Sequence, residues 1–356
     1  MSNIQKIGIV GRVSEKLCDG QTVKTRILVH ELHKHYPNCE IIIAESSDFK
    51  HRPFTVLLQM MCCLRKCDVI FVLLSRNGMR VLFPLLHLLN KIWKKPLFHD
   101  CIGGSLDEVI KLYPSIARYL NKFDINWVET QHLKDRLDNL GICNVEVLPN
   151  FKPLECLSSN DLRLHPTIPF RFCTFSRVNH AKGIDNAAQT VLDINHDAGE
   201  LRATLDIYGP IEDGFEVELN RLIRDSNGAV QYKGVVNYSE SIGVLKDYFM
   251  LLFPTHFFGE GFPGTLIDAF SAGLPVIATD WHCNGEIISD GYTGFLYPTD
   301  EPHRLRMLME KAMENPDQIL GMGKNCLEEV QKYSADAVMQ IVCEKIQKIE
   351  RSLLNE

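Results

Sequence analysis

The stretch between residues 250 and 280 limits the possible folds most, because it has the pattern of a strand, a glycine-rich loop, a helix and a second strand. The apolar run 250–254 is typical of a buried strand, and 276–278 is a second one. Between them, residues 265–272 are expected to form a short helix that Gly273 ends. Two strands joined by a helix make one unit of a parallel sheet. The chain is therefore expected to be an α/β protein.

The loop of this unit has the features of an anion and sugar site. Gly259, Gly261 and Gly264 leave the backbone open to a ligand, and the first amides of the following helix point outward at the positive end of its dipole. That arrangement suits a phosphate. Glu260 and Asp268 flank it, and one carboxylate can accept hydrogen bonds from two neighbouring hydroxyls of a ribose or a hexose. Phosphate and sugar together indicate a nucleotide sugar.

The length of 356 residues and the repeated alternation of strands and helices indicate two domains. In the first half, helices are expected at 22–35 and 81–93, and strands at 7–10, 40–44, 69–73, 96–99 and 127–129. The alternation repeats from 170 to 298. The polar segment 150–169, which holds three prolines, is expected to link the halves, and 335–354 to form an amphipathic helix.

Several other protein classes do not fit. The first strand is followed by Gly11-Arg12-Val13-Ser14, without the third glycine of a dinucleotide-binding loop, and the Walker lysine motif is absent. The 12 cysteines are scattered without a second close pair, which favours reduced cysteines over a zinc site. No secretory leader is expected at 1–6, and the apolar runs are too short to span a bilayer. A cytoplasmic protein, soluble or peripheral to the membrane, is expected.

Charge is divided unevenly along the chain. Residues 1–151 hold 20 Lys and Arg against 15 Asp and Glu, a net +5, whereas the remainder holds 18 against 30, a net −12. A basic N-terminal half favours an anionic partner, although charge runs are more often solvated surface.

Four motifs, in order along the chain, resemble those of one family. They are Val147-Leu148-Pro149-Asn150, the Ser-Arg-Val-Asn-His-Ala-Lys-Gly-Ile-Asp run at 176–185, the loop and helix at 259–280, and the Asn-Gly-Glu to Gly-Phe-Leu run at 284–296. Together they resemble the retaining family 4 glycosyltransferases (glycosyl transferases group 1), whose signature is Glu-x7-Glu. Here the second acid is Asp268.

The resemblance implies an architecture. Two Rossmann-like domains would face each other across a cleft, the arrangement called GT-B. Residues 1–151 would form the N-terminal acceptor domain and 152–334 the nucleotide-sugar donor domain. Residues 335–356 would form a crossover helix that returns to the N-terminal domain.

The resemblance also implies how the donor is held. Arg177 and Lys182 follow the expected strand 172–175, and the family's matching pair binds the leaving diphosphate without a metal. The chemistry agrees, because Arg can grip a phosphate bidentately and Lys adds a mobile charge. No Asp-x-Asp metal motif follows a suitable strand. We therefore expect no metal and no cofactor, only the nucleotide sugar as co-substrate.

Other roles follow from matching the signature loop position by position. Glu260 would meet hydroxyls of the transferred sugar, and Gly264 would offer its amide to that sugar. Thr265 and Leu266 would offer amides to the phosphates. Asp268 would hold the ribose diol, with a looser or water-bridged contact because its side chain is one methylene shorter than the family's glutamate.

Four further residues are expected near the substrates. The family places a glycine loop at Gly20, near the diphosphate and the acceptor, although an ordinary turn glycine is an equally good interpretation. Gly209 and Gly234 fall where the family lets the backbone approach the base. The family often has a His-Asp pair that faces the sugar where His99 and Asp100 end a strand. His99 would then hydrogen-bond the sugar or influence the acceptor's proton, although a lone histidine is more often structural; the role of Asp100 is less defined.

The resemblance thus implies a retaining, metal-independent hexosyltransferase that acts on a glycan or lipid-linked acceptor in polysaccharide biosynthesis, with no nucleic acid as partner. The segment 76–95 has basic ends and an apolar middle, which fits either contact with an anionic membrane or a packed helix; burial of the middle is favoured. Two alternatives stay open. One is a nucleotide-sugar 2-epimerase of the same fold, and the other is a catalytically silent nucleotide-sugar-binding partner, suggested by Asp268.

Overall fold

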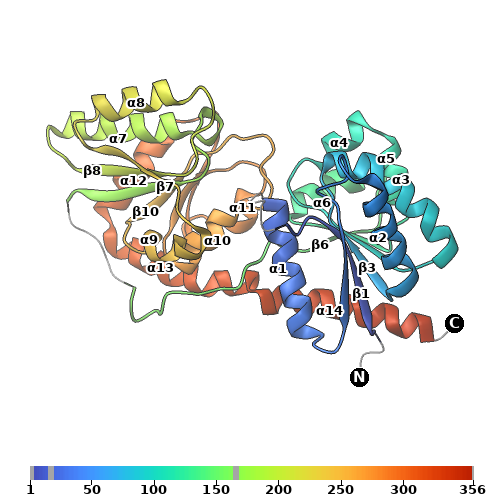
Figure 1. Cartoon of the computed structure of the whole chain (residues 1–356). Coiled ribbons are helices and arrows are strands. Elements are labelled where there is room, and N and C mark those ends of the chain that lie inside the picture. Colours follow the sequence, from blue (N-terminus) through green and yellow to red (C-terminus); the bar gives the residue numbers. More distant parts are fainter. Residues whose placement is uncertain (1–3, 15–19, 163–167, 355–356) are drawn as a thin grey trace. The chain divides into compact units, whose positions relative to one another are not determined.

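The computed structural model describes residues 4–14, 20–162 and 168–354. Its internal contacts divide the chain into two units. The N-terminal unit comprises residues up to Pro153 together with those from Tyr333 onward, and the C-terminal unit comprises Leu154–Lys332. Each unit holds one six-stranded sheet whose neighbouring strands are all parallel (Figure 1). Two Rossmann-like units, as the sequence predicts, therefore make up the fold.

The sheet of the N-terminal unit has the order β2-β1-β3-β4-β5-β6. Its strands are β1 (Lys6–Gly11), β2 (Glu40–Glu45), β3 (Val69–Val72), β4 (Leu97–Asp100), β5 (Ile125–Val128) and β6 (Val145–Val147). Its helices are α1 (Gly20–His35), α2 (Pro53–Lys66), α3 (Arg76–Trp93), α4 (Leu106–Leu112), α5 (Ser115–Leu120), α6 (Gln131–Asp138) and α14 (Ala335–Leu354).

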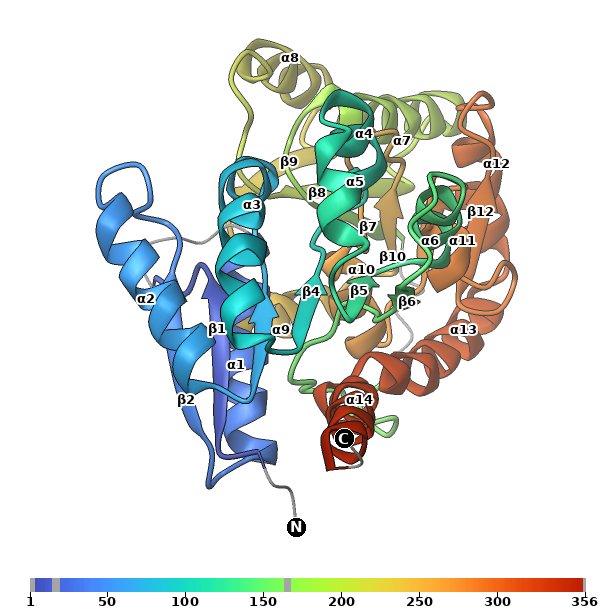
Figure 2. The ribbon, with the colours of Figure 1, turned by 90° about the vertical axis from the view of Figure 1, so that its right-hand side faces the viewer.

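Successive side chains of each strand point to opposite faces of the sheet, and both faces are apolar. Ile7 and Ile9 of β1 pack in one cluster with side chains of α1 and α14, and Val10 packs in another with α2 and α3. Figure 2 shows α14 beside the sheet in this unit. Val338, Met339, Val342 and Ile346 of α14 are buried there, so one side of this helix completes one of the two faces.

The sheet of the C-terminal unit has the order β12-β11-β10-β7-β8-β9. Its strands are β7 (Phe170–Phe175), β8 (Ala203–Tyr208), β9 (Val230–Gly234), β10 (Met250–Phe253), β11 (Val276–Thr279) and β12 (Gly294–Tyr297). Its α-helices are α7 (Ile184–Ala198), α8 (Glu216–Asp225), α9 (Ser241–Leu245), α10 (Gly264–Ser271), α11 (Asn284–Ile287), α12 (Arg304–Glu314) and α13 (Pro316–Glu329). The short 3₁₀ turns are η1 (His180–Lys182), η2 (Tyr238–Glu240) and η3 (Val330–Tyr333).

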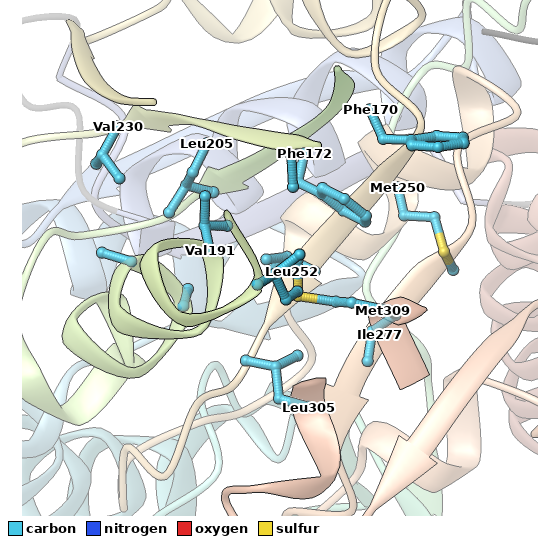
Figure 3. Packing of buried hydrophobic residues seen from close by; sticks show 14 of the residues in the cluster. Phe170, Phe172, Val191, Leu205, Val230, Met250, Leu252, Ile277, Leu305 and Met309 are labelled. Atoms are coloured by element: carbon cyan, nitrogen blue, oxygen red, sulfur yellow. The ribbon is translucent and has the colours of Figure 1, made fainter. Parts of the chain in front are cut away.

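Helices cover both faces of this second sheet. Side chains of α7, α8 and α12 join β7, β8 and β10 in one apolar cluster, in which Phe172, Val191 and Leu252 interdigitate (Figure 3). Figure 1 shows α9, α10 and α13 on the opposite side of the sheet from α7 and α8. The central strand β10 is buried along its whole length, which explains its uninterrupted apolar sequence.

Helix α3 differs from the expectation for the segment 76–95. It begins at Arg76, five residues earlier than the predicted 81, and it continues through Pro84. One face is buried through Met79, Leu82 and Phe83, but the middle of the helix is not covered all round, because Val81 and Leu88 are exposed. None of the helices among the described residues combines the length and the apolar character that crossing a membrane would need.

Candidate functional site

The expected donor residues of the C-terminal unit meet where the strand order reverses. The chain continues from β7 to β8 on one side and adds β10 on the other, so the carboxyl ends of β7 and β10 form the switch point of this sheet. Ligands of open parallel sheets bind at such a point. Arg177 and Lys182 follow β7, and Thr255 and Glu260 follow β10.

Lys182 and Glu260 form the centre of this site. The ammonium group of Lys182 makes an ion pair with Oε2 of Glu260, and the two side chains are only 7% and 10% exposed. The buried hydroxyl of Thr255 donates to the same oxygen at 2.9 Å. The sequence analysis expects the lysine to bind phosphate and the glutamate to bind sugar. The structure brings both side chains into one cluster, in which Glu260 is the counter-ion of Lys182.

The backbone around the cluster is held closely. The amide of His256 donates to the carbonyl of Ala181 at 2.8 Å, which joins the two loops directly. Gly183 adopts a φ of +68°, and a Cβ at this position would lie 2.3 Å from the carbonyl oxygen of Pro254. Only glycine permits both the conformation and the approach. The glycine after Lys182 therefore fixes the distance between the lysine and the end of β10.

Arg177 lies at the more open side of the cluster. Its guanidinium is 4.6 Å from the ring centroid of Phe257, and the ammonium of Lys182 is 5.1 Å from the same centroid. The nearest acid of Arg177 is Glu212, at 3.9 Å. With its side chain 46% exposed, Arg177 remains accessible to an incoming anion.

The charge of Lys182 is incompletely compensated. Burial lowers the pKa of Lys182 below its ordinary value of 10.5, the carboxylate of Glu260 offsets this only in part, and the charge of Arg177 adds to the lowering. Of the two carboxylates near these cations, only that of Glu260 is buried with Lys182, whereas that of Glu212 is 53% exposed and 3.9 Å from Arg177. An anion that bound here would supply the missing negative charge. Such an excess of positive charge is expected of a phosphate site.

Helix α10 carries three more of the expected residues, Thr265, Leu266 and Asp268. Asp268 is 8% exposed, and the hydroxyl of Thr265 is buried without a hydrogen-bond partner among the described residues. The amide of Leu266, however, donates to the carbonyl of Pro263 at 3.0 Å, and its side chain is fully buried. The first helical turn thus already uses this donor in the structure, and a contact of the Leu266 amide with a phosphate stays a prediction.

Gly209 and Gly234 lie together at the ends of β8 and β9. The amide of Gly209 donates to the carbonyl of Gly234 at 2.9 Å. Gly209 has a φ of +131°, and a Cβ there would lie 1.8 Å from the carbonyl oxygen of Ser176. Position 209 is thus a glycine because its backbone packs against the loop that carries Arg177. Contact of either glycine with a base stays a prediction.

In the N-terminal unit, the structure corrects the expectation for His99. The ring is fully buried, lies 5.3 Å from the ring centroids of Phe83 and Phe123, and pairs through Nδ1 with the Asn126 side-chain oxygen at 3.0 Å. Burial lowers the pKa of His99 to about 4, so the ring is neutral at pH 7. A neutral ring enclosed by aromatic side chains has the environment of a core residue.

The neighbouring Asp100 points to the other face, into a buried ionic cluster that the sequence did not reveal. The ammonium of Lys24, on α1, lies 2.9 Å from Asp100 Oδ1 and 3.1 Å from Glu129 Oε1. All three residues are at most 5% exposed. Glu129 also accepts the amide of Gly103 at 3.2 Å, so the cluster fixes the loop after β4. Gly20, the first residue of α1, is exposed, and the residues directly before it, 15–19, lie outside the described part of the chain.

Thr255 and Phe257 were missed by sequence reasoning. Both follow β10 directly, and the only available signal was their position after a buried strand. Among the described residues, one set of acids and histidine is close enough to hold a metal, namely Glu31, His35 and Asp336. Lys34 already lies 2.6 Å from Asp336 and 3.6 Å from Glu31, so a lysine supplies the positive charge there.

Comparison with known proteins places this geometry in context. Residues 169–315 match the family model of glycosyl transferases group 1. Over 136 residues the chain is 34% identical to the UDP-N-acetylglucosamine–peptide N-acetylglucosaminyltransferase GtfA subunit of Streptococcus pneumoniae. That match covers 38% of this chain and 26% of the relative, so the chain spans about a quarter of the relative's length.

Two solved structures resemble the whole chain. HepE of Anabaena in complex with UDP superposes with a TM-score of 0.74 at 14% identity, covering 97% of this chain and 100% of HepE. Sucrose-phosphate synthase of Thermosynechococcus elongatus gives a TM-score of 0.76 at 14% identity, covering 98% and 100%. At such low identity the likeness concerns the fold, which is GT-B.

Proposed function

Because the chain has the GT-B fold and carries a glycosyl transferases group 1 domain at residues 169–315, we propose that it transfers a sugar from a nucleotide sugar to a glycan or lipid-linked acceptor. The observation that carries the proposal is the buried pair of Lys182 and Glu260, with Arg177 beside it, at the switch point inside the matched segment. UDP sugars are the first donors to test, since the GtfA relative is named for one and HepE binds UDP.

In this proposal the leaving diphosphate takes the place of the missing negative charge. Arg177 and Lys182 stabilise the charge that grows on the phosphate oxygen as its bond to the anomeric carbon breaks. Glu260, released in part from Lys182, accepts hydroxyl hydrogen bonds of the sugar, and Asp268 accepts those of the ribose. These roles need no metal, because two cations already face the phosphates.

The transfer needs no nucleophile from the protein. The bond between the anomeric carbon and the phosphate oxygen breaks, the acceptor oxygen forms the new bond on the same face, and the acceptor proton passes to the departing phosphate. The anomeric configuration is therefore retained. A hexose donor and a role in polysaccharide biosynthesis complete the proposal.

The test has two stages. First, the melting temperature is measured with a panel of nucleotides and nucleotide sugars, because a ligand that binds only the folded state raises it by mass action. Second, the preferred donor is incubated with glycan acceptors, with and without a chelator, and the products are analysed. Transfer that survives the chelator supports the proposal. Epimerised donor without any acceptor would assign the 2-epimerase activity instead, and binding without turnover in every mixture would assign a silent partner.

A further inference from the structure

The N-terminal unit has a pocket that the donor chemistry does not use. It has a volume of about 490 Å³, within the usual range of small-molecule sites, roughly 300–1,000 Å³. It lies at the carboxyl ends of β1, β2 and β3: Arg12 and Ser46 directly follow the first two strands, and Ser75 lies in the loop after the third. In this sheet β1 lies between β2 and β3, so the pocket occupies the switch point of the N-terminal unit.

The walls of this pocket are built by specific hydrogen bonds. One carboxylate, that of Glu45, accepts the amides of Val13 and Ser47 at 2.9 Å each, and thereby joins the loops after β1 and β2. The loop after β2 is a hydrogen-bonded turn in which Asp48 accepts the amides of His51 and Arg52. The pocket is therefore a preformed feature of the unit.

The polar lining favours an anion. Arg12 and Lys50 contribute two positive charges to the lining, and the one acid that joins the wall loops, Glu45, accepts the backbone amides of Val13 and Ser47. The guanidinium of Arg12 lies 3.4 Å from the hydroxyl of Ser75, which orients it at the pocket wall. Hydroxyls of Ser46 and Ser47 and the amide of Asn77 add hydrogen-bonding groups. A phosphate attached to a sugar matches this combination of charge and hydroxyl recognition.

The remaining lining is apolar and continues outside the pocket. Phe49, Pro53, Leu74 and Leu82 form its apolar wall together with Val81. Val81 also begins an exposed stripe on α3 with Leu88 and Ile92, which are 48%, 61% and 71% exposed. Positions separated by 7 and 11 residues lie on one helix face, and this stripe extends for roughly 16 Å. An apolar surface thus leads directly out of an anion pocket.

We propose that this pocket binds an anionic amphiphile, a phosphate-linked sugar whose hydrocarbon chain lies along the stripe of Val81, Leu88 and Ile92. The phosphate would meet Arg12 and Lys50, and the sugar the serines and Asn77. The inference rests on the proposed function in one respect, because it treats this ligand as the acceptor of the transfer.

The experiment measures binding to the full chain by calorimetry. The probes are inorganic phosphate, decanol and the hexyl, octyl and decyl monophosphates, each below its critical micelle concentration. Affinity should rise from hexyl to decyl phosphate, by up to roughly fourfold for each methylene that becomes buried, and decanol should bind more weakly than decyl phosphate. Weak binding of phosphate with no dependence on chain length would mean that the pocket binds a free sugar phosphate. That result would overturn the proposal of a lipid-linked ligand.

Two variants separate the head group from the chain. Arg12→Gln with Lys50→Gln should weaken all alkyl phosphates on the order of 10-fold or more, since charged hydrogen bonds are lost. Val81→Ser with Leu88→Ser and Ile92→Ser should abolish the dependence on chain length and leave inorganic phosphate unchanged. Lys91→Gln, an exposed lysine on the same helix, and Val217→Ser, on α8 and 80% exposed, are the matched controls.

Nucleoside diphosphate binding is measured on the same proteins. The inference fails, and the proposed function stands, if the protein binds nucleoside diphosphates but not alkyl phosphates. The same conclusion follows if alkyl phosphates bind the double variant as tightly as the parent. If nucleotides fail to bind, the proposed function fails. A peptide that binds in place of the alkyl phosphates, with loss in the double variant, would assign the pocket to a peptide and overturn the inference.

Discussion

The two units each bury a lysine among carboxylates, but they balance its charge differently. In the N-terminal unit, Lys24 contacts both Asp100 and Glu129, and these carboxylates raise its pKa above the ordinary value of 10.5 despite complete burial. In the C-terminal unit, Lys182 has the single partner Glu260 and a neighbouring Arg177, and burial lowers its pKa. The charge of Lys24 is therefore balanced within the protein, whereas Lys182 gains from an added anion. The first cluster instead has an excess of carboxylate: burial raises the pKa of Asp100, and its Oδ2 has no hydrogen-bond partner among the described residues. A lysine that the protein's own carboxylates balance fits a structural role, and a lysine with too little opposite charge fits an anion site.

The largest expected effect is on the stability of the N-terminal unit. Lys24→Met should destabilise the protein by about 3–5 kcal/mol, because it leaves two buried carboxylates without their cation. Denaturant unfolding of parent and variant measures the loss. The control is Lys6→Met, which removes a pair with Glu40 at the surface and should change little. Equal losses in the two variants would mean that the buried cluster has no structural role.

The next effect is on turnover in the C-terminal unit. Arg177→Ala and Lys182→Ala should each lower turnover by about 10²-fold or more at saturating donor, because charge opposite the leaving diphosphate is lost. The circular dichroism spectrum should stay that of the parent. Lys324→Ala, an exposed lysine of α13, serves as the control. Near-normal turnover in both purified variants would exclude these residues from the reaction.

The two acids of the signature loop should separate in their effects. Glu260→Gln should lose transfer far more than nucleotide affinity, since its proposed contact is with the sugar. Asp268→Asn should also weaken the free nucleoside diphosphate, because its proposed partner is the ribose. Calorimetry with the diphosphate and a turnover assay measure both quantities. Equal losses of nucleotide affinity would contradict the division of roles.

The pH dependence should follow the pKa directions of the two lysines. The pKa of Lys182 is lowered, so as the pH rises its ammonium group deprotonates before pH 10.5 is reached. Donor affinity should fall as the pH rises through this pKa. The pKa of Lys24 is raised, so its stabilisation is complete below pH 10.5 and is lost only above it. Titration of diphosphate affinity against pH measures the first. Lys182→Arg, whose charge persists, should remove that fall; an unchanged profile would assign it to another group.

The smallest effect is expected at His99. Because its ring is buried and neutral, His99→Leu should leave turnover per folded molecule close to that of the parent. Loss of the hydrogen bond to Asn126 should lower stability by about 1–3 kcal/mol. Turnover corrected for the folded fraction tests this. A selective loss of turnover would restore His99 as a catalytic residue.

The sequence predicted the fold well because its strongest signals are local. Buried parallel strands such as Met250–Phe253 are continuous apolar runs, and glycine ends the helix before β11. The family resemblance supplied the two-domain architecture. Boundaries were less accurate where no cap was recognised, as at the start of α3, where Ser75 precedes the first turn.

The site was predicted in its residue types but not in its pairings. Lys182 and Glu260 are 78 positions apart, and only the strand order brings the ends of β7 and β10 together. Lys24 and Glu129 gave no sequence signal, since an exposed and a buried lysine look alike in a helix pattern. His99 was misjudged because position at a strand end does not reveal which face of the sheet the side chain enters. Amide use at Leu266 likewise depends on the exact turn at Pro263.

The burial of α14 in the N-terminal unit has a consequence for biosynthesis. Val338, Met339 and Val342 complete the apolar cluster that contains Ile7 and Leu28, yet the ribosome adds them only after the whole C-terminal unit. At about 5–20 residues per second, the earliest strands wait on the order of ten seconds or more for this helix. During that interval the part of this face that α14 covers stays exposed, although α1 already packs on the rest, while the later-made unit can close around its own core. Nascent chains stalled before residue 335 should therefore recruit chaperones to their oldest segment.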